Sequence, residues 1–214
     1  MTARSPVAAW AVAAGALGFI ISAVFSSLLQ LPRGPFVLAH AIAVGLFAAL
    51  FVERRGLDRS GRRWHTGYAL LAGLALGGIL VQGVISQPGG TAPRGLELAT
   101  GLAWYGLVYG AADALLLTII PVRAITGSEA KSTGFPWRGV VALASSLLVT
   151  ALYHAGFEEF RGTSLLQPLI GNAIVTIGYL LTGNPATPLV AHAIMHGAAV
   201  LHGMEGTSQL PPHY

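Results

Sequence analysis

The stretch LATGLAWYGLVYGAADALLLTIIP, residues 98–121, indicates the fold class because it is apolar over a length that can cross a bilayer. A spanning helix takes roughly 20 residues. The chain contains further runs of this kind, and the predicted spanning segments are 7–29, 35–53, 67–86, 98–121, 138–157, 165–183 and 187–203. The strands of a membrane barrel would alternate apolar and polar residues, whereas these runs are solidly apolar. We therefore expect an all-α polytopic membrane protein, a bundle of about seven transmembrane helices.

The composition of the 214 residues agrees with an integral membrane protein. Apolar residues make up 54% of the chain and charged residues only 9%, a balance that no soluble globular domain of this size matches well. The connecting loops are short and rich in Gly and Pro, and no insertion is large enough for a second domain. We expect a single integral membrane domain over residues 1–214, surrounded by lipid, with the first apolar run retained as a helix.

The basic residues predict how the chain lies in the membrane. They concentrate between the second and third segments, at Arg54, Arg55, Arg59, Arg62 and Arg63. Because Lys and Arg are enriched in cytoplasmic loops, this loop and the N-terminus are expected in the cytoplasm, and the membrane is expected to be a bacterial cytoplasmic membrane. The net charge of +4 is explained by this topology. Nucleic acid is not an expected partner.

Polar side chains inside the apolar segments are the first candidates for function. Asp113 lies in the middle of 98–121, where an ionised side chain costs at least ~2.5 kcal/mol. We therefore expect it to face the bundle interior within reach of a His or Arg. His40 is expected to be a hydrogen-bonded core histidine, and Asn172 is a further intramembrane polar residue.

Two further groups of ionisable residues stand in the later segments, His154-Ala-Gly-Phe-Glu158-Glu159-Phe-Arg161 and Ala191-His192-Ala-Ile-Met-His196. Residues four apart share one helix face, so His154 with Glu158 and His192 with His196 are each expected to point one way. Three imidazoles and a carboxylate suit Zn²⁺ or another divalent ion. Zinc held by three ligands lowers the pKa of its bound water to about 7, and a nearby carboxylate such as Glu159 could take the proton.

These groups predict one polar cavity, open toward the outer half of the membrane and lined by both pairs. The glutamates have a second interpretation that the sequence leaves open. Glu158 and Glu159 can equally mark the outer end of the fifth segment, with Arg161 pairing one of them at the interface.

At these residues the chain resembles the CPBP, CAAX-protease-like or Abi family of intramembrane metalloproteases. One matching segment is Glu158-Glu159-Phe160-Arg161-Gly162, and the other reads YLLTGN from Tyr179, then Pro188, then AHAIMH ending at His196. The resemblance implies a helical membrane enzyme that cleaves hydrophobic or membrane-bound peptides. It implies catalytic roles for Glu158, Glu159 and Arg161, and a role for His192 in holding water or a metal.

Two main function classes follow from the sequence. The first is an intramembrane metal-dependent hydrolase of the peptidase type. The second is a non-enzymatic membrane protein that binds an ion, a haem or another hydrophobic ligand, or that serves as a small subunit among other membrane subunits. The chain has no cysteine, but haem needs only paired histidines, which His40, His154, His192 or His196 could supply. A proton-coupled carrier using Asp113 is a third possibility.

Overall fold

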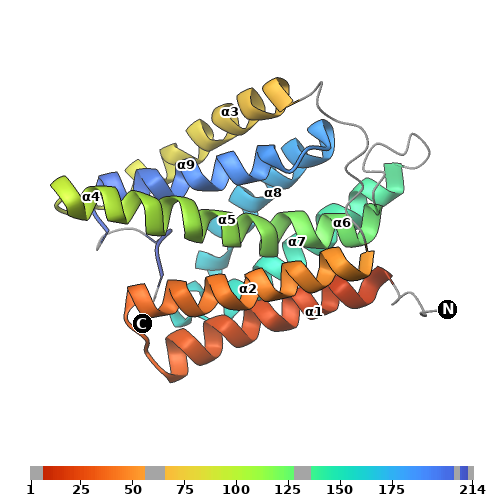
Figure 1. Ribbon diagram of the computed structural model, residues 1–214, viewed down its shortest axis with the longest axis horizontal. Helices are drawn as coiled ribbons and strands as arrows, with labels where there is room; N and C mark the ends of the chain where they lie inside the picture. Colours follow the sequence, from red (N-terminus) through yellow and green to blue (C-terminus); the bar gives the residue numbers. More distant parts are fainter. Residues whose placement is uncertain (1–6, 56–65, 128–135, 205–207, 212–214) are drawn as a thin grey trace.

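The computed structural model describes residues 7–55, 66–127, 136–204 and 208–211, and in this part of the chain every regular element is helical (Figure 1). This confirms the prediction of an all-α bundle with seven long helical segments. The first helices are α1 Val7–Ile20, continued by η1 Ile21–Leu28, then α2 Arg33–Arg55 and α3 Thr66–Ile85. Next comes one continuous helical rod made of α4 Gly95–Gly101, η3 Leu102–Tyr109, α5 Gly110–Asp113, η4 Ala114–Ile119 and α6 Ile120–Thr126. The last elements are α7 Pro136–Ala155, the short turns η5 Glu158–Phe160 and η6 Thr163–Leu165, α8 Leu166–Thr182 and α9 Ala186–His202.

Six of these described segments are long and apolar enough to cross a membrane. The seventh, α9, has 17 residues and packs inside the bundle. Leucines such as Leu46 and Leu71 are largely exposed on the outer face, where lipid would cover them. These features are compatible with an integral membrane protein. Arg59, Arg62 and Arg63 lie outside the described residues, and the orientation of the N-terminus stays a prediction.

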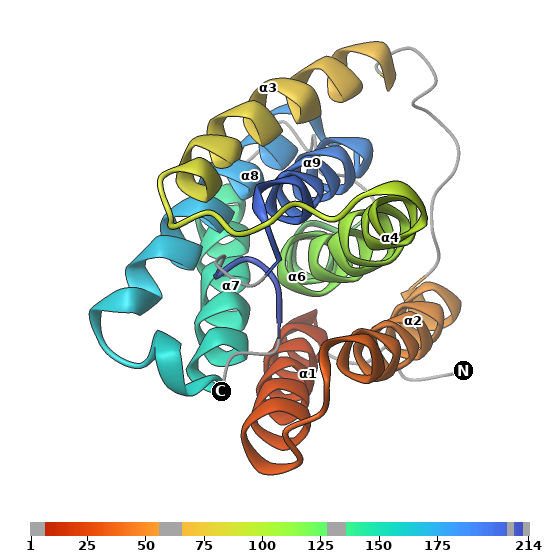
Figure 2. The ribbon, with the colours of Figure 1, turned by 90° about the vertical axis from the view of Figure 1, so that its left-hand side faces the viewer.

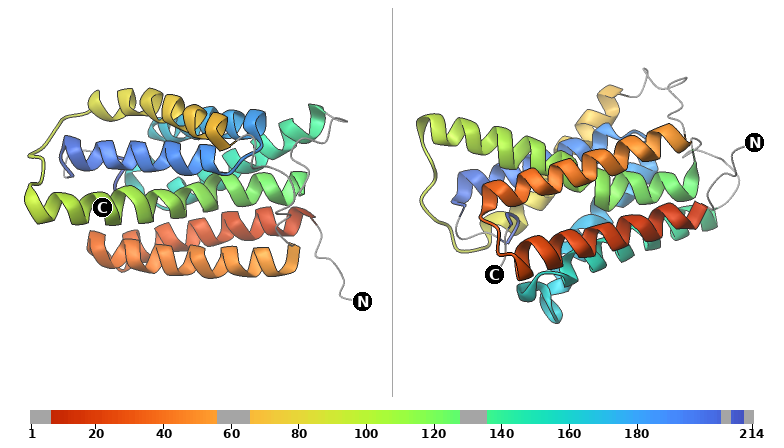
Figure 3. Two further views of the ribbon diagram at one scale, coloured as in Figure 1. Left: turned by 45° about the horizontal axis from the view of Figure 1, so that its top comes forward. Right: turned by 60° about the horizontal axis from the view of Figure 1, so that its bottom comes forward.

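The rod from Gly95 to Thr126 is the centre of the bundle. In its most apolar window 72% of the residues are buried, against 28–33% for the other spanning segments. Figure 2 shows this rod, in green, between α9 and α2, and Figures 1 and 3 show α1 and α2 on one side of it and α3, α8 and α9 on the other. Residues 111–120 of the rod are all buried or half-buried, so this stretch is held away from lipid. Asp113 lies within it.

Glycines bring the central rod into backbone contact with α9. A Cβ added at Gly110 would lie 3.1 Å from the Cα of Ala193, and one added at Gly106 would lie 3.3 Å from the Cα of Gly197. Gly106 and Gly110 are four residues apart, as are Ala193 and Gly197, which is the small-residue pattern that lets membrane helices approach closely. His192 directly precedes Ala193, so this contact places the α9 histidines beside the rod.

The rod also alternates between α-helical turns and wider π-helical turns. Asp113 ends a single α-helical turn, Gly110–Asp113, which lies between the π-helical segments Leu102–Tyr109 and Ala114–Ile119. The junction residues Tyr109 and Ala114 both keep right-handed helical backbone angles, so the rod is continuous. Wider turns of this kind occur frequently at functional sites.

Candidate buried Asp–His site

Asp113 lies between two imidazoles that come from opposite sides of the rod. Its Oδ1 is 3.3 Å from Nε2 of His40 on α2, and its Oδ2 is 3.2 Å from Nε2 of His196 on α9. Asp113 is 4% exposed and His40 is fully buried. The prediction that Asp113 faces the interior within reach of a histidine is confirmed. The carboxylate links two helices that are far apart in the sequence.

His192 joins this pair to form a cluster, defined here as Asp113, His192 and His196. One ligand atom from each residue lies within 4.8 Å of the others. His192 and His196 are one turn apart on α9, and their rings stack with centroids 6.0 Å apart. The ligands of one zinc ion stand roughly 3.4 Å apart for bonds of about 2.0–2.1 Å, so the cluster needs only a modest contraction to hold an ion.

The buried nitrogens of the cluster also fit a ligand. Within the described residues, neither ring nitrogen of His192 has a hydrogen-bond partner, although both are buried. Leaving such a group unsatisfied costs about 1–3 kcal/mol. A donor set of two imidazoles and a carboxylate is one that zinc and similar divalent ions accept. The buried Asp113–His192–His196 group could therefore hold a metal ion.

Two tyrosines enclose the cluster. The hydroxyls of Tyr109 and Tyr153 lie 2.9 Å apart, and the Tyr109 ring packs against the rings of His196 and His40, with centroid distances of 4.7 and 5.3 Å. Both tyrosines are buried, and in such a protein interior the electrostatic interactions between Asp113 and the histidines are stronger than in water. Neither tyrosine was predicted as a site residue, although Tyr109 stands four residues before Asp113 and so on the same helix face.

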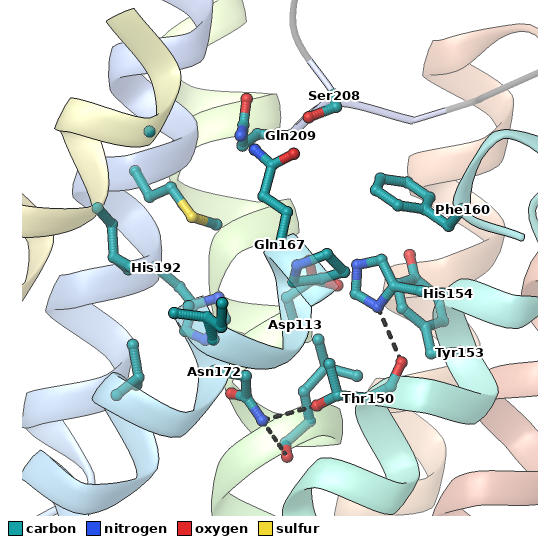
Figure 4. Close-up of a pocket in the computed structure, with 18 of the residues that line it drawn as sticks. Asp113, Thr150, Tyr153, His154, Phe160, Gln167, Asn172, His192, Ser208 and Gln209 are labelled. Atoms are coloured by element: carbon teal, nitrogen blue, oxygen red, sulfur yellow. Dashed lines mark hydrogen bonds between the residues drawn. The ribbon is translucent and has the colours of Figure 1, made fainter. Parts of the chain in front are cut away.

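A cavity of about 670 Å³ opens beside the cluster (Figure 4). Asp113, His154, His192 and His196 all line it, together with apolar side chains of α3 and α8. The structure places His154, His192 and His196 along one cavity, as predicted, but the lining of that cavity is mainly apolar. The prediction is wrong for Glu158, which does not line the cavity.

Glu158 lies outside because α7 ends too early for the four-residue spacing to apply. The helix stops at Ala155, and Gly156 packs so closely against Ser22 that a side chain there would overlap it. The Gly156 carbonyl accepts a hydrogen bond of 2.7 Å from the Ser27 hydroxyl. Beyond this point the backbone turns away, and Phe157 and Phe160 are buried in place of the glutamates.

The two glutamates and Arg161 lie on the surface. Glu158 and Arg161 form an ion pair of 3.4 Å whose side chains are 64% and 60% exposed, and Glu159 is exposed as well. This matches the second interpretation of the sequence, in which Arg161 pairs with one glutamate beyond the end of the helix. Exposed ion pairs contribute little to stability. Among the described residues that line the cavity, Asp113 is the carboxylate.

His154 stands apart from the cluster but faces the same cavity. It is not one of the three residues whose ligand atoms converge, so the structure replaces it with Asp113 in the predicted ligand set. Its Nδ1 lies 2.9 Å from the carbonyl oxygen of Thr150. Because a carbonyl can only accept, Nδ1 must carry the proton, and in the neutral ring Nε2 is then the basic nitrogen.

Asn172 has a structural position at the bottom of the cavity. Pro121 has no N–H to offer the carbonyl of Leu117 four residues before it. Ser146 donates to that carbonyl at 2.6 Å and Asn172 at 3.4 Å. Asn172 also donates to the hydroxyls of Ser146 and Thr150 and accepts from Thr118. These bonds join the rod to α7 and α8, and they explain why a polar side chain is tolerated there.

The site therefore combines a buried carboxylate–imidazole cluster, a separate basic imidazole and an apolar cavity between them and the lipid-facing helices. Such a set can hold a divalent ion or a water molecule, and it can transfer a proton. Comparisons of the chain with protein-family models, with curated proteins and with solved structures found no match.

Proposed function

We propose that this protein is an intramembrane metal-dependent hydrolase of the peptidase type that acts on hydrophobic or membrane-bound peptides. The observation that supports this most is the buried Asp113–His192–His196 cluster in the wall of a largely apolar cavity. Three ionisable groups in one apolar place are costly, and a core without function would be expected to use apolar residues there. The cavity provides space for a substrate beside the cluster.

In this proposal Asp113, His192 and His196 hold a divalent ion, with zinc as the first candidate. Bound there, such an ion would supply a water molecule with a pKa of about 7 and a Lewis acid for a carbonyl oxygen. His40 lies behind Asp113 and orients its carboxylate through the 3.3 Å contact, as outer partners of metal ligands do. His154 lines the cavity, and its Nε2 would act as the base that takes a proton from the attacking water.

The substrate is expected to enter from the membrane. Ile79 of α3 and Ile170 of α8 both line the cavity, and they are also 53% and 60% exposed on the outside of the bundle. The cavity therefore reaches the lipid-facing surface between these two helices. A hydrophobic chain could pass there without leaving an apolar environment.

Two measurements on the purified protein in lipid nanodiscs test the proposal: elemental analysis, and cleavage of a panel of quenched fluorescent hydrophobic peptides. His192→Ala should lose both metal and cleavage. His154→Gln should keep the metal while cleavage falls by about 10²–10⁴-fold, because a base is lost and a ligand is kept. Glu97→Gln, an exposed change on α4, is the control and should alter neither.

Glu158→Gln separates this assignment from the one that the family resemblance implies. The surface position of Glu158 predicts unchanged cleavage, whereas a catalytic glutamate would lose it. Bound metal with no cleavage of any peptide would contradict the hydrolase and favour the non-enzymatic ion-binding protein. Absence of metal together with normal cleavage would contradict the metal-dependent mechanism.

A further inference from the structure

The C-terminal residues 208–211 form a segment that crosses the end of the bundle and is anchored on both sides (Figure 2). The backbone N–H of Ser208 donates to Oε1 of Gln87 at 2.7 Å, and Nε of Arg33 donates to the carbonyl of Pro211 at 2.7 Å. Between these two contacts Leu210 is buried in the main hydrophobic core. The segment is therefore an integral part of the fold.

This segment supplies part of the cavity wall. Ser208 and Gln209 both line the cavity, and so does Gln167 near the start of α8. Figure 4 shows Gln167 and Gln209 at the same end of the cavity, with Asn172 at the other end and Asp113 between them. The cavity thus has a polar end formed by amide side chains, an apolar flank on α3 and α8, and the ionisable cluster between.

Gln209 has an unsatisfied polar atom at this end. Its Oε1 is buried and has no hydrogen-bond partner within the described residues. Turning the amide by half a turn would place its nitrogen there instead and leave a donor without a partner. Because an unsatisfied buried polar group costs about 1–3 kcal/mol, a molecule in the cavity, a water or a ligand, is expected to supply the missing bond.

We propose that Gln209, together with Gln167, forms an amide-binding subsite that takes a backbone amide of a peptide whose apolar part lies between α3 and α8. The inference rests on the proposed function for the choice of a peptide. A glutamine side chain offers one acceptor and two donors, so it can pair with both the N–H and the C=O of a peptide unit. The subsite would fix the peptide's position along the cavity relative to the cluster.

The test compares N-decanoyl-glycyl-valinamide with depsipeptide analogues, in each of which one amide N–H is replaced by an ester oxygen. Binding to the full-length protein in nanodiscs is measured by thermophoresis, and product is followed in the same samples by mass spectrometry. One analogue should bind the wild type about 5- to 30-fold more weakly than the parent, the range expected for losing one hydrogen bond to a buried acceptor.

The variant Gln209→Met has a side chain of similar length but without an amide. In this variant the ratio of the parent peptide's affinity to that analogue's affinity should be close to one. Gln82→Met makes the same change at an exposed position of α3 that does not line the cavity, and it should keep the wild-type ratio. Size-exclusion profiles and melting temperatures establish that both variants are folded. The comparison between variants removes the general effect of an ester on binding.

Three outcomes would overturn the subsite: no binding of the parent peptide, equal binding of every analogue to the wild type, or an unchanged ratio in a folded Gln209→Met. Its failure is distinguishable from failure of the proposed function. Cleavage without any N–H preference would remove the subsite and support the hydrolase. N–H-dependent binding without cleavage of any peptide would support the subsite and remove the hydrolase.

Discussion

Replacing Gly110 by Ala should disturb the site through packing alone. The new Cβ would lie 3.1 Å from both the Cα and the backbone N of Ala193. These are backbone atoms, so no side chain can rotate away, and the rod and α9 must separate by a few tenths of an ångström. Overpacking in a well-packed core costs typically about 1–3 kcal/mol. We expect the free energy of unfolding to fall within that range.

The same separation should weaken metal binding. Asp113 is three residues after Gly110 on the rod, and its cluster partners flank Ala193 on α9. Binding an ion requires the three ligand atoms to move together, and separating the rod from α9 opposes that movement, so zinc affinity should fall by about tenfold or more. Unfolding is followed in mixed detergent micelles, and zinc affinity by competition with a fluorescent chelator.

A matched control isolates the packing effect. Gly78 is an exposed glycine of α3 with nothing within 4 Å of an added Cβ, so Gly78→Ala carries only the intrinsic difference in helix propensity, up to about 1 kcal/mol. If Gly110→Ala and Gly78→Ala gave the same stability and the same zinc affinity, the argument that backbone contact positions the cluster would be refuted.

Three other predictions follow from the structure. Asp113→Asn should lower zinc affinity about tenfold or more, measured by the same competition; unchanged affinity would remove Asp113 from the ligand set. Asn172→Leu removes the four hydrogen bonds of this side chain, and at about 0.6 kcal/mol each for membrane proteins unfolding should become roughly 2 kcal/mol easier; a stabilised variant would contradict the role assigned to the network. Cysteines introduced at Ser60 and Gly90 should react with impermeant thiol reagents from opposite sides of the membrane, against a background without native cysteine; labelling from one side would contradict the predicted topology.

The sequence by itself determined the helical architecture and the interior position of Asp113. In a bilayer every backbone polar group must be satisfied within the protein, so a long apolar run specifies a helix from local information alone. A carboxylate in the middle of such a run is too costly to face lipid. The side of the helix that carries it must therefore face the protein interior, whichever helices pack there. Both predictions concern a single segment and its solvent, which is why they were confirmed.

The tertiary structure decided which residues meet. Apolar helices are alike in hydropathy, and nothing in that signal states that α2 and α9 flank the rod, so the contacts of Asp113 with His40 and His196 could not be derived from the sequence pattern. The four-residue spacing of Gly106 and Gly110 indicates that another helix packs closely there, but it does not indicate which helix that is. The end of α7 was likewise determined by a tertiary contact, because Gly156 packs against Ser22 and accepts a hydrogen bond from Ser27, both in η1. That contact turned Glu158 to the surface and left Asp113 as the carboxylate of the cavity.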